Sequence, residues 1–190
     1  MSGSVCVYCS SSDAVPGVYF DAAKAFGAAL AKSGRTLIYG GGNIGLMGTL
    51  ARSVHEHGGH VIGVIPEALR ELELAYKRAD ELIVTADLRE RKAAMESRAD
   101  AFVALPGGYG TLEEMIEILT LKQLHFHEKP IVIVNTDDFY RPLLAMFEQM
   151  YTQHFAKPET RLLYHVAADA AGALDYIESY VPAKTPRKWY

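Results

Sequence analysis

The stretch from Asp100 to Glu114 narrows the possible folds because it predicts a strand, a turn and a helix in immediate succession. Residues 102–105 form a short apolar run that stops at Pro106, as a buried strand does before a turn. After Thr111 the apolar side chains recur at helical spacing, at Leu112, Met115, Ile116, Ile118 and Leu119. A strand that feeds directly into a helix is the repeating unit of α/β folds.

The turn between that strand and that helix is rich in glycine, at Gly107, Gly108 and Gly110. Because glycine has no Cβ atom, a ligand can approach the backbone N–H groups of such a turn closely. The unpaired N–H groups and the positive dipole end of a helix N-terminus attract anions, so we expect a phosphate to fit at this turn. The turn lacks the Lys-Ser/Thr ending of a triphosphate-binding loop, which favours a monophosphate over ATP.

The same residues allow an interpretation that needs no ligand. Thr111 and Glu114 fit the Thr-x-x-Glu capping box, in which two side chains satisfy the free N–H groups at a helix start. The two interpretations are compatible, because a capped helix can still present its glycine loop.

Elsewhere, short apolar runs alternate with helical segments. We expect strands at residues 5–8, 35–39, 60–65, 81–85, 102–105, 130–134 and within 161–167. We expect helices at residues 19–32, from the second glycine loop to about 57, 88–98, from 111 onward, 139–151 and 169–180. This order predicts one α/β domain over residues 1–181, with a doubly wound parallel sheet and helices on both faces, followed by a mobile tail over residues 182–190. Right-handed crossovers then bring the glycine loops to one edge of the sheet.

Composition excludes several classes of protein. The chain has 190 residues, of which 49% are hydrophobic and 22% charged, so it can form a core without metals or disulfides. A formal net charge of -4 argues against a nucleic-acid binder. Because no apolar run reaches about 18 residues and the N-terminus has no signal-peptide pattern, we expect a cytoplasmic protein that does not enter the membrane.

A second glycine loop, Gly40–Gly48, follows the strand expected at residues 35–39. Gly40, Gly42 and Gly45 fit the G-x-G-x-x-G pattern of dinucleotide sites. The acidic residue that should follow about 20 positions later is poorly matched, which disfavours an NAD-dependent oxidoreductase. The alternative is that these glycines serve tight packing of the strand against the helix. The polar loop at residues 10–13 has two interpretations as well, as a donor of hydroxyl and N–H groups to a ligand or as an ordinary turn.

The cysteines and histidines have structural explanations. Cys6 and Cys9 form a lone Cys-x-x-Cys in or just after a strand, without the second pair of a zinc site. Histidines gather at expected helix ends, where they suit the helix dipole, at His55, His57, His60, His125 and His127. We therefore predict no metal and no cofactor.

Charged side chains flank the expected phosphate site. Glu113 and Glu114 follow it, and Arg91 and Lys92 precede it by one helix. A carboxylate next to a bound nucleoside monophosphate suits cleavage at the anomeric carbon of the ribose, because the transition state there resembles a cation. Alternatively, the two cations form i,i+4 ion pairs within their own helix, Asp87 with Arg91 and Lys92 with Glu96.

Residues 105–114 read Leu-Pro-Gly-Gly-Tyr-Gly-Thr-Leu-Glu-Glu and resemble the P-G-G-x-G-T-x-x-E motif of the LONELY GUY (LOG) family. These are cytokinin riboside 5'-monophosphate phosphoribohydrolases, once labelled lysine decarboxylases. Gly40–Gly48 is similar to the family's other glycine loop, and the likeness extends to about residue 180. The resemblance implies a homodimeric, Rossmann-like enzyme that hydrolyses the N-glycosidic bond of N6-modified AMP, or of AMP, to the free base and ribose 5-phosphate. A non-catalytic nucleotide carrier of related fold is the alternative.

The resemblance also implies roles for individual residues. Glu114 matches a catalytic glutamate that would stabilise the ribosyl cation, and Arg91 matches a catalytic arginine that would orient the substrate. The chain departs from the family pattern at Leu88, where methionine is usual, and at Ser10, where glycine is usual. The predicted substrate-binding residues are Ser10, Gly41, Gly42, Asn43, Glu73, Arg91, Lys92, Gly107, Gly108, Tyr109, Gly110, Thr111, Leu112, Glu113, Glu114 and Thr120.

Overall fold

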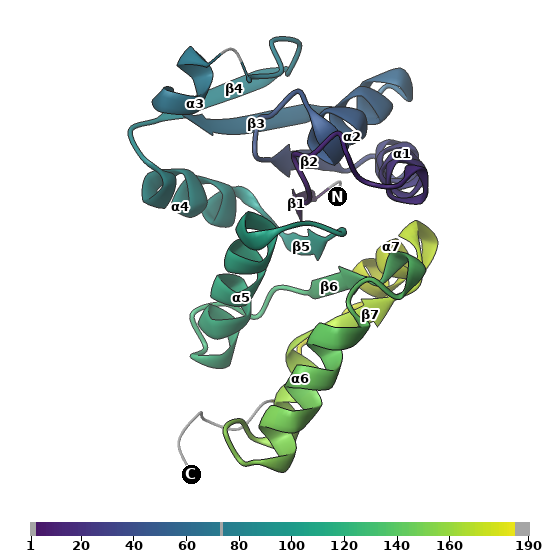
Figure 1. Ribbon diagram of the computed structural model, residues 1–190, viewed down its shortest axis with the longest axis vertical. Coiled ribbons are helices and arrows are strands. Elements are labelled where there is room, and N and C mark those ends of the chain that lie inside the picture. Colours follow the sequence, from purple (N-terminus) through teal and green to yellow (C-terminus); the bar gives the residue numbers. More distant parts are fainter. Residues whose placement is uncertain (1–2, 73, 185–190) are drawn as a thin grey trace.

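In the computed structural model, which describes residues 3–72 and 74–184, seven parallel strands form one sheet (Figure 1). The strands are β1 (Ser4–Tyr8), β2 (Thr36–Tyr39), β3 (Val61–Pro66), β4 (Glu81–Thr85), β5 (Ala101–Ala104), β6 (Ile131–Val134) and β7 (His165–Ala167). Their order across the sheet is β4-β3-β2-β1-β5-β6-β7. The chain therefore builds the sheet outward from β1 in one direction, then returns to β5 and continues in the other. The point where this order reverses, between β1 and β5, is where ligands bind in folds of this kind.

Helices connect the strands and cover both faces of the sheet. They are α1 (Gly17–Lys32), α2 (Gly45–Glu56), α3 (Glu67–Glu71), α4 (Leu88–Arg98), α5 (Tyr109–Gln123), α6 (Arg141–Thr152) and α7 (Ala170–Ser179), with short 3-10 helices η1 (Thr136–Asp138) and η2 (Pro158–Leu163). The expected α/β architecture, a doubly wound parallel sheet with helices on both faces, is confirmed.

Side-chain alternation along the strands divides the core into two clusters. In β1, Val5 and Val7 pack with buried residues of α1, α2 and α7. The intervening Cys6 and Tyr8 point to the opposite face and pack with Met95 of α4 and with residues of α5 and α6. This period of two, with both sets buried, explains why the strands appear in the sequence as continuous apolar runs.

The end of the chain differs from the sequence-based expectation. Only residues 165–167 of the range 161–167 are in a strand, because Pro158–Leu163 forms the 3-10 helix η2. Proline at the start of η2 has its φ angle already fixed near the helical value, which favours such a turn. Residues 185–190, most of the expected tail, lie outside the described residues, so the tail remains a prediction. No helix in the described ranges is long and apolar enough to cross a membrane.

Candidate active site

Three loops meet at the carboxyl edge of the sheet, beside the reversal point. The loop after β1 lies between the two glycine loops: the Ser10 N–H donates to the Pro106 carbonyl at 3.2 Å, and the Met47 N–H donates to the Ser10 carbonyl at 3.2 Å. A pocket of about 240 Å³ opens between them, lined by Ser10, Val15, Tyr19, Leu46, Pro106, Gly107, Gly108 and Phe139. Ser10 also makes an ordinary turn, because its hydroxyl accepts from the Ser12 N–H at 3.0 Å. These contacts confirm the turn, and binding of a ligand by this loop stays a prediction.

The N-terminus of α5 presents its backbone N–H groups without a side-chain cap. The helix begins at Tyr109, two residues before the expected start at Thr111, and Gly108 is the N-cap residue. The first N–H groups of a helix have no acceptor within the helix, and no side chain takes that place here. The predicted capping box is wrong, because Thr111 is already the third helical residue and the Glu114 carboxylate bonds elsewhere. The turn is thus open to an anion.

The glycines of this turn have different roles. A Cβ atom at Gly107 would lie 2.1 Å from the Thr111 Oγ1 atom, so close packing against α5 requires glycine there. A Cβ atom at Gly108 or Gly110 would meet nothing within 4 Å, and neither residue has a positive φ. Packing and backbone strain do not account for these two glycines. Their effect is to keep the approach to the N–H groups bare.

The second glycine loop is explained by the structure of the chain itself. Gly41 and Gly45 have φ angles of +72° and +61°, which favour glycine, and a Cβ atom at Gly48 would lie 1.9 Å from the Asn43 carbonyl oxygen. The N-terminus of α2 already has an anionic partner, because the Gly45 N–H donates to the Asp13 carboxylate at 2.8 Å. These contacts support the packing interpretation of the loop over a dinucleotide site. No local sequence pattern links Asp13 to α2.

Arg91 of α4 and Glu114 of α5 form an ion pair near the carboxyl edge of the sheet. Arg91 Nη1 donates to Glu114 Oε1 at 2.5 Å, and each side chain is only 11% exposed. Arg91 Nε also donates to the carbonyl of Val64, in β3, at 3.0 Å. Burial raises the pKa of Glu114 above its ordinary value, although the charge of Arg91 opposes this shift. The site thus holds a desolvated carboxylate in the second turn of the helix that presents its N-terminus.

The predicted ion pairs within α4 are wrong, because Arg91 and Lys92 contact α5 instead. Asp87 caps α4, accepting from the N–H groups of Arg89 and Glu90, each at 2.8 Å. Lys92 bonds to Glu113 and, at 2.8 Å, to Glu117. These bonds raise the pKa of the Lys92 amine. The two helices are therefore joined by two adjacent ion-pair groups.

Other predicted substrate-binding residues lie apart from this pair. The Asn43 N–H donates to the Leu74 carbonyl at 2.8 Å, and Gly42 forms a β-bridge with Ala75. The backbone of residues 42 and 43 therefore pairs with residues 74 and 75 of the same chain. Tyr109 is 94% exposed, and Leu112 is partly buried against the core. Glu73 lies outside the described residues.

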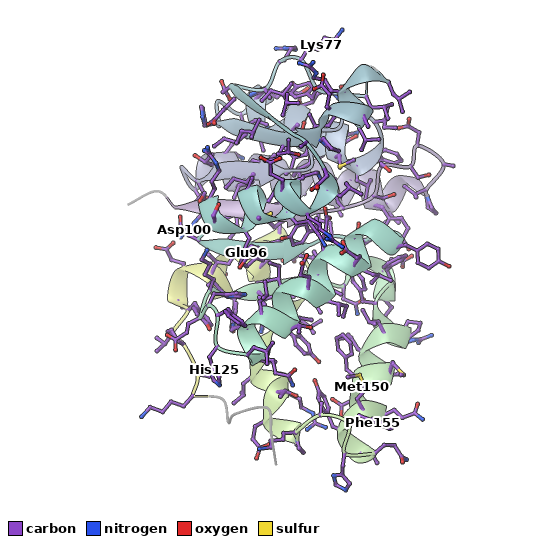
Figure 2. All side chains as sticks on the ribbon, turned by 90° about the vertical axis from the view of Figure 1, so that its left-hand side faces the viewer. Lys77, Glu96, Asp100, His125, Met150 and Phe155 are labelled. Atoms are coloured by element: carbon purple, nitrogen blue, oxygen red, sulfur yellow. The ribbon has the colours of Figure 1, made fainter. Side chains whose placement is uncertain are left out.

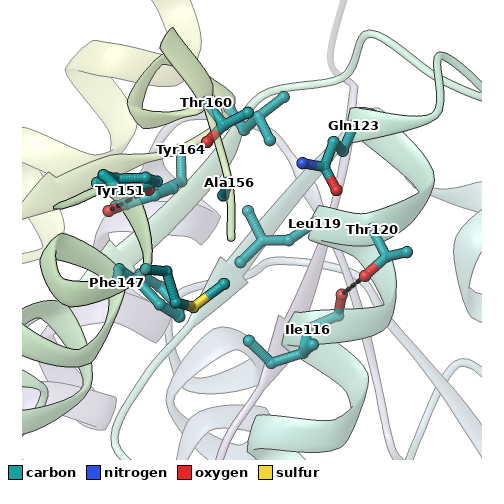
Figure 3. Close-up of a pocket in the computed structure, with 11 residues that line it drawn as sticks. Ile116, Leu119, Thr120, Gln123, Phe147, Tyr151, Ala156, Thr160 and Tyr164 are labelled. Atoms are coloured by element: carbon teal, nitrogen blue, oxygen red, sulfur yellow. Dashed lines mark hydrogen bonds between the residues drawn. The ribbon is translucent and has the colours of Figure 1, made fainter. Parts of the chain in front are cut away.

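Thr120 lies further along α5, about 14 Å from Thr111 at the usual helical rise. Its hydroxyl donates to the Ile116 carbonyl at 2.8 Å. Figure 3 shows it at the border of an apolar pocket, where Ile116 and Leu119 of α5 face Phe147 and Tyr151 of α6. The structure therefore does not bring Thr120 to the Arg91–Glu114 pair within one subunit.

The two cysteines are buried in the core, and His55 of α2 contacts side chains of the same chain. Cys6 and Cys9 are free buried thiols, and burial raises the pKa of each. His55 contacts the Tyr76 hydroxyl at 2.9 Å and the Asp80 carboxylate at 3.0 Å. Across residues 3–72 and 74–184, no group of three or more His, Cys, Asp and Glu side chains could hold a metal ion.

Comparison with known proteins relates this edge to one family. The sequence model described as "Possible lysine decarboxylase" matches residues 47–177. The cytokinin riboside 5'-monophosphate phosphoribohydrolase LOG5 of Arabidopsis thaliana is 42% identical over 178 residues, which cover 94% of this chain and 78% of that protein. The enzyme LOG of Oryza sativa subsp. japonica is 43% identical over 178 residues, covering 94% and 74%. This chain belongs to the LOG family.

Solved structures place the LOG-family chain in a wider fold group. The molybdenum cofactor carrier protein of Chlamydomonas reinhardtii superimposes with a TM-score of 0.70 over 94% of this chain and 97% of that chain. Its sequence identity is 24%, so the likeness establishes the shared Rossmann-like fold alone.

Proposed function

We propose that this LOG-family protein hydrolyses the N-glycosidic bond of cytokinin riboside 5'-monophosphates, which are N6-modified AMP, or of AMP itself. The products are the free base and ribose 5-phosphate. One observation carries the proposal: Glu114, paired with Arg91 of α4 and only 11% exposed, lies in the second turn of α5, the helix whose N-terminal N–H groups have no side-chain cap. The names of the relatives, cytokinin riboside 5'-monophosphate phosphoribohydrolases, support the same substrate class.

The proposed mechanism begins with the substrate phosphate on the N–H groups of residues 109–111. Glu114 is three residues beyond Thr111, about 4.5 Å along the axis at the usual rise, so its carboxylate can face the ribose. As the bond to the base breaks, positive charge develops at the anomeric carbon, and a fixed carboxylate stabilises it. Water adds to that carbon, one of its protons leaves with the base, and the other product is ribose 5-phosphate.

Arg91 has two parts in this mechanism. Its guanidinium holds the Glu114 carboxylate in one orientation, and its charge opposes the effect of burial so that more of the carboxylate stays ionised. The Val64 carbonyl accepts from Nε and so fixes the position of the guanidinium. A guanidinium held in one position can orient the substrate. Glu114 and Arg91 are accordingly our candidates for the catalytic residues.

The direct test is incubation of the purified protein with AMP and with isopentenyl-AMP. Ribose 5-phosphate is measured by a reducing-sugar assay and the free base by chromatography. Adenosine, which lacks the phosphate, is the matched control and should react poorly. Binding of AMP without release of ribose 5-phosphate would indicate a nucleotide carrier, the alternative suggested by the shared fold of the molybdenum cofactor carrier.

We also infer that the enzyme acts as a cytoplasmic homodimer. Several large apolar side chains are exposed on α5, on α6 and in the loops that follow them: Ile116, Phe126, Met146 and Phe155. Phe155, with Met150, lies at the end of the molecule opposite Lys77 (Figure 2). A second subunit covering this region would remove apolar surface from water. In such a dimer, Thr120 of one subunit could contact a substrate bound to the other. Light scattering should give twice the mass of the chain, and a monomer would contradict the inference.

A further inference from the structure

Gly40, the residue after β2, is buried at the start of the second glycine loop. Its φ angle is not positive, so the backbone conformation would accept any L-residue. A Cβ atom at this position would nevertheless lie 2.2 Å from Arg91 Nη2, 3.4 Å from Arg91 Cζ and 3.0 Å from Met47 Sδ. The space that a side chain would occupy at residue 40 is thus filled by the Arg91 guanidinium.

Arg91 cannot move aside without losing its contacts. The Val64 carbonyl holds Nε at 3.0 Å, and Glu114 holds Nη1 at 2.5 Å. The guanidinium is therefore fixed on two sides, and the absence of a Cβ atom at Gly40 leaves room on the third. Met47 ends in a flexible thioether, so it can yield where Arg91 cannot.

We propose that Gly40 is a positioning residue for the hydrolysis, because it keeps open the space in which the Arg91 guanidinium contacts both Val64 and Glu114. This inference rests on the proposed function. It assigns the first glycine of the second loop an action through Arg91, whereas the other glycines of that loop serve its own turns and packing.

The test compares Gly40→Ala with the control Gly17→Ala, at a glycine where an added Cβ atom meets nothing within 4 Å. In Gly40→Ala we expect the kcat for AMP to fall roughly 10- to 100-fold, because displacement of a catalytic group by about 1 Å costs up to that much. The melting temperature should fall by only a few degrees, because the added methyl group displaces side chains and not backbone and costs the guanidinium hydrogen bonds that it makes in the wild type. The acid limb of the pH–kcat profile should move to higher pH, since Arg91 would lower the pKa of Glu114 less. Gly17→Ala should retain wild-type kcat and profile.

A double-mutant cycle shows whether Gly40 acts through Arg91. The double variant Gly40→Ala/Arg91→Ala should be no slower than Arg91→Ala alone. If the two losses multiply, Gly40 acts independently of Arg91 and the proposal is overturned. An unchanged kcat and pH profile in Gly40→Ala, with an active wild type, overturns it as well and leaves the proposed function intact.

A crystal structure of Gly40→Ala gives a readout that does not depend on activity. The Arg91 guanidinium should be displaced from the Val64 carbonyl. If Arg91 keeps both of its contacts in this variant, the inference about Gly40 is wrong, even when the wild type proves inactive and the proposed function fails separately.

Discussion

Substitution of Glu114 by Gln tests the role of the buried carboxylate. Gln has nearly the same volume, and its amide oxygen can still accept from Arg91 Nη1, but the negative charge is lost. Glu114 is only 11% exposed, so its charge acts in a desolvated environment where a developing cation is stabilised more strongly than in water. We therefore expect kcat for AMP to fall by about 10³, which corresponds to roughly 4 kcal/mol of barrier.

The same substitution has a smaller effect on folding. Removing one partner of a buried ion pair can cost about 3 to 5 kcal/mol when the other charge is left alone. Arg91 is not left alone, because the Val64 carbonyl still accepts from Nε and the new amide oxygen can accept from Nη1. We therefore expect a loss of only about 1.5 to 3 kcal/mol in the free energy of unfolding, the range of one hydrogen bond to a charged group.

The assay measures kcat and urea unfolding for Glu114→Gln beside Glu117→Gln. Glu117 lies on the same helix and also bonds to a cation of α4, but it is 41% exposed and its partner is Lys92. The control should keep wild-type kcat within about twofold, because Glu117 has no part in the proposed mechanism, and its loss should change stability little, as surface ion pairs contribute little. Turnover by Glu114→Gln within tenfold of the wild type would refute the assignment of Glu114 as the group that stabilises the cation.

Further predictions follow from the glycines, Glu114 and Lys122. Gly108→Ala should raise the KM for AMP without lowering the melting temperature, whereas Gly107→Ala should lower the melting temperature, because only the latter clashes with α5. The kcat of the wild type should rise with pH through a pKa above the ordinary glutamate value, since Glu114 must be ionised; an acid limb below pH 4.5 would contradict this role. Burial lowers the pKa of the Lys122 amine to about 8. The amine makes no hydrogen bond within the described residues and lies 4.8 Å from the centre of the Tyr180 ring, so Lys122→Met should be more stable at pH 7 by about 1 to 3 kcal/mol. In the unfolded chain the Lys122 amine has the ordinary pKa of 10.5. Between pH 8 and 10.5 the unfolded state therefore binds more protons than the folded state, so the wild type gains stability as the pH rises. The difference in the free energy of unfolding between Lys122→Met and the wild type should shrink over this range in urea titrations.

The sheet and the glycine turn before α5 were predictable because their signals are local. Each strand is a short apolar run between turn residues, and the order of strands and helices allows few topologies. The turn at Gly107–Gly110 was visible for the same reason, since a strand, three glycines and a helix occur within 15 residues. The helix start was misplaced by two residues, because the sequence of a capping box does not show whether Glu114 has a stronger partner.

The contacts that shape the site could not be predicted, because they join residues far apart in the sequence. Arg91 and Glu114 are 23 positions apart, and local spacing favoured Asp87 as the partner of Arg91. Asp13 and Gly45 are 32 positions apart, and nothing near either residue indicates that one caps the helix of the other. In each case tertiary packing places a partner that the i,i+4 rule cannot find.

A crystal structure of Glu114→Gln with AMP bound tests the central claim most directly, because the slow variant should retain intact substrate. The phosphate should accept hydrogen bonds from the N–H groups of residues 109–111, with the anomeric carbon facing residue 114. A phosphate at the N-terminus of α2, in place of the Asp13 carboxylate, or a ribose turned away from residue 114, would contradict the account.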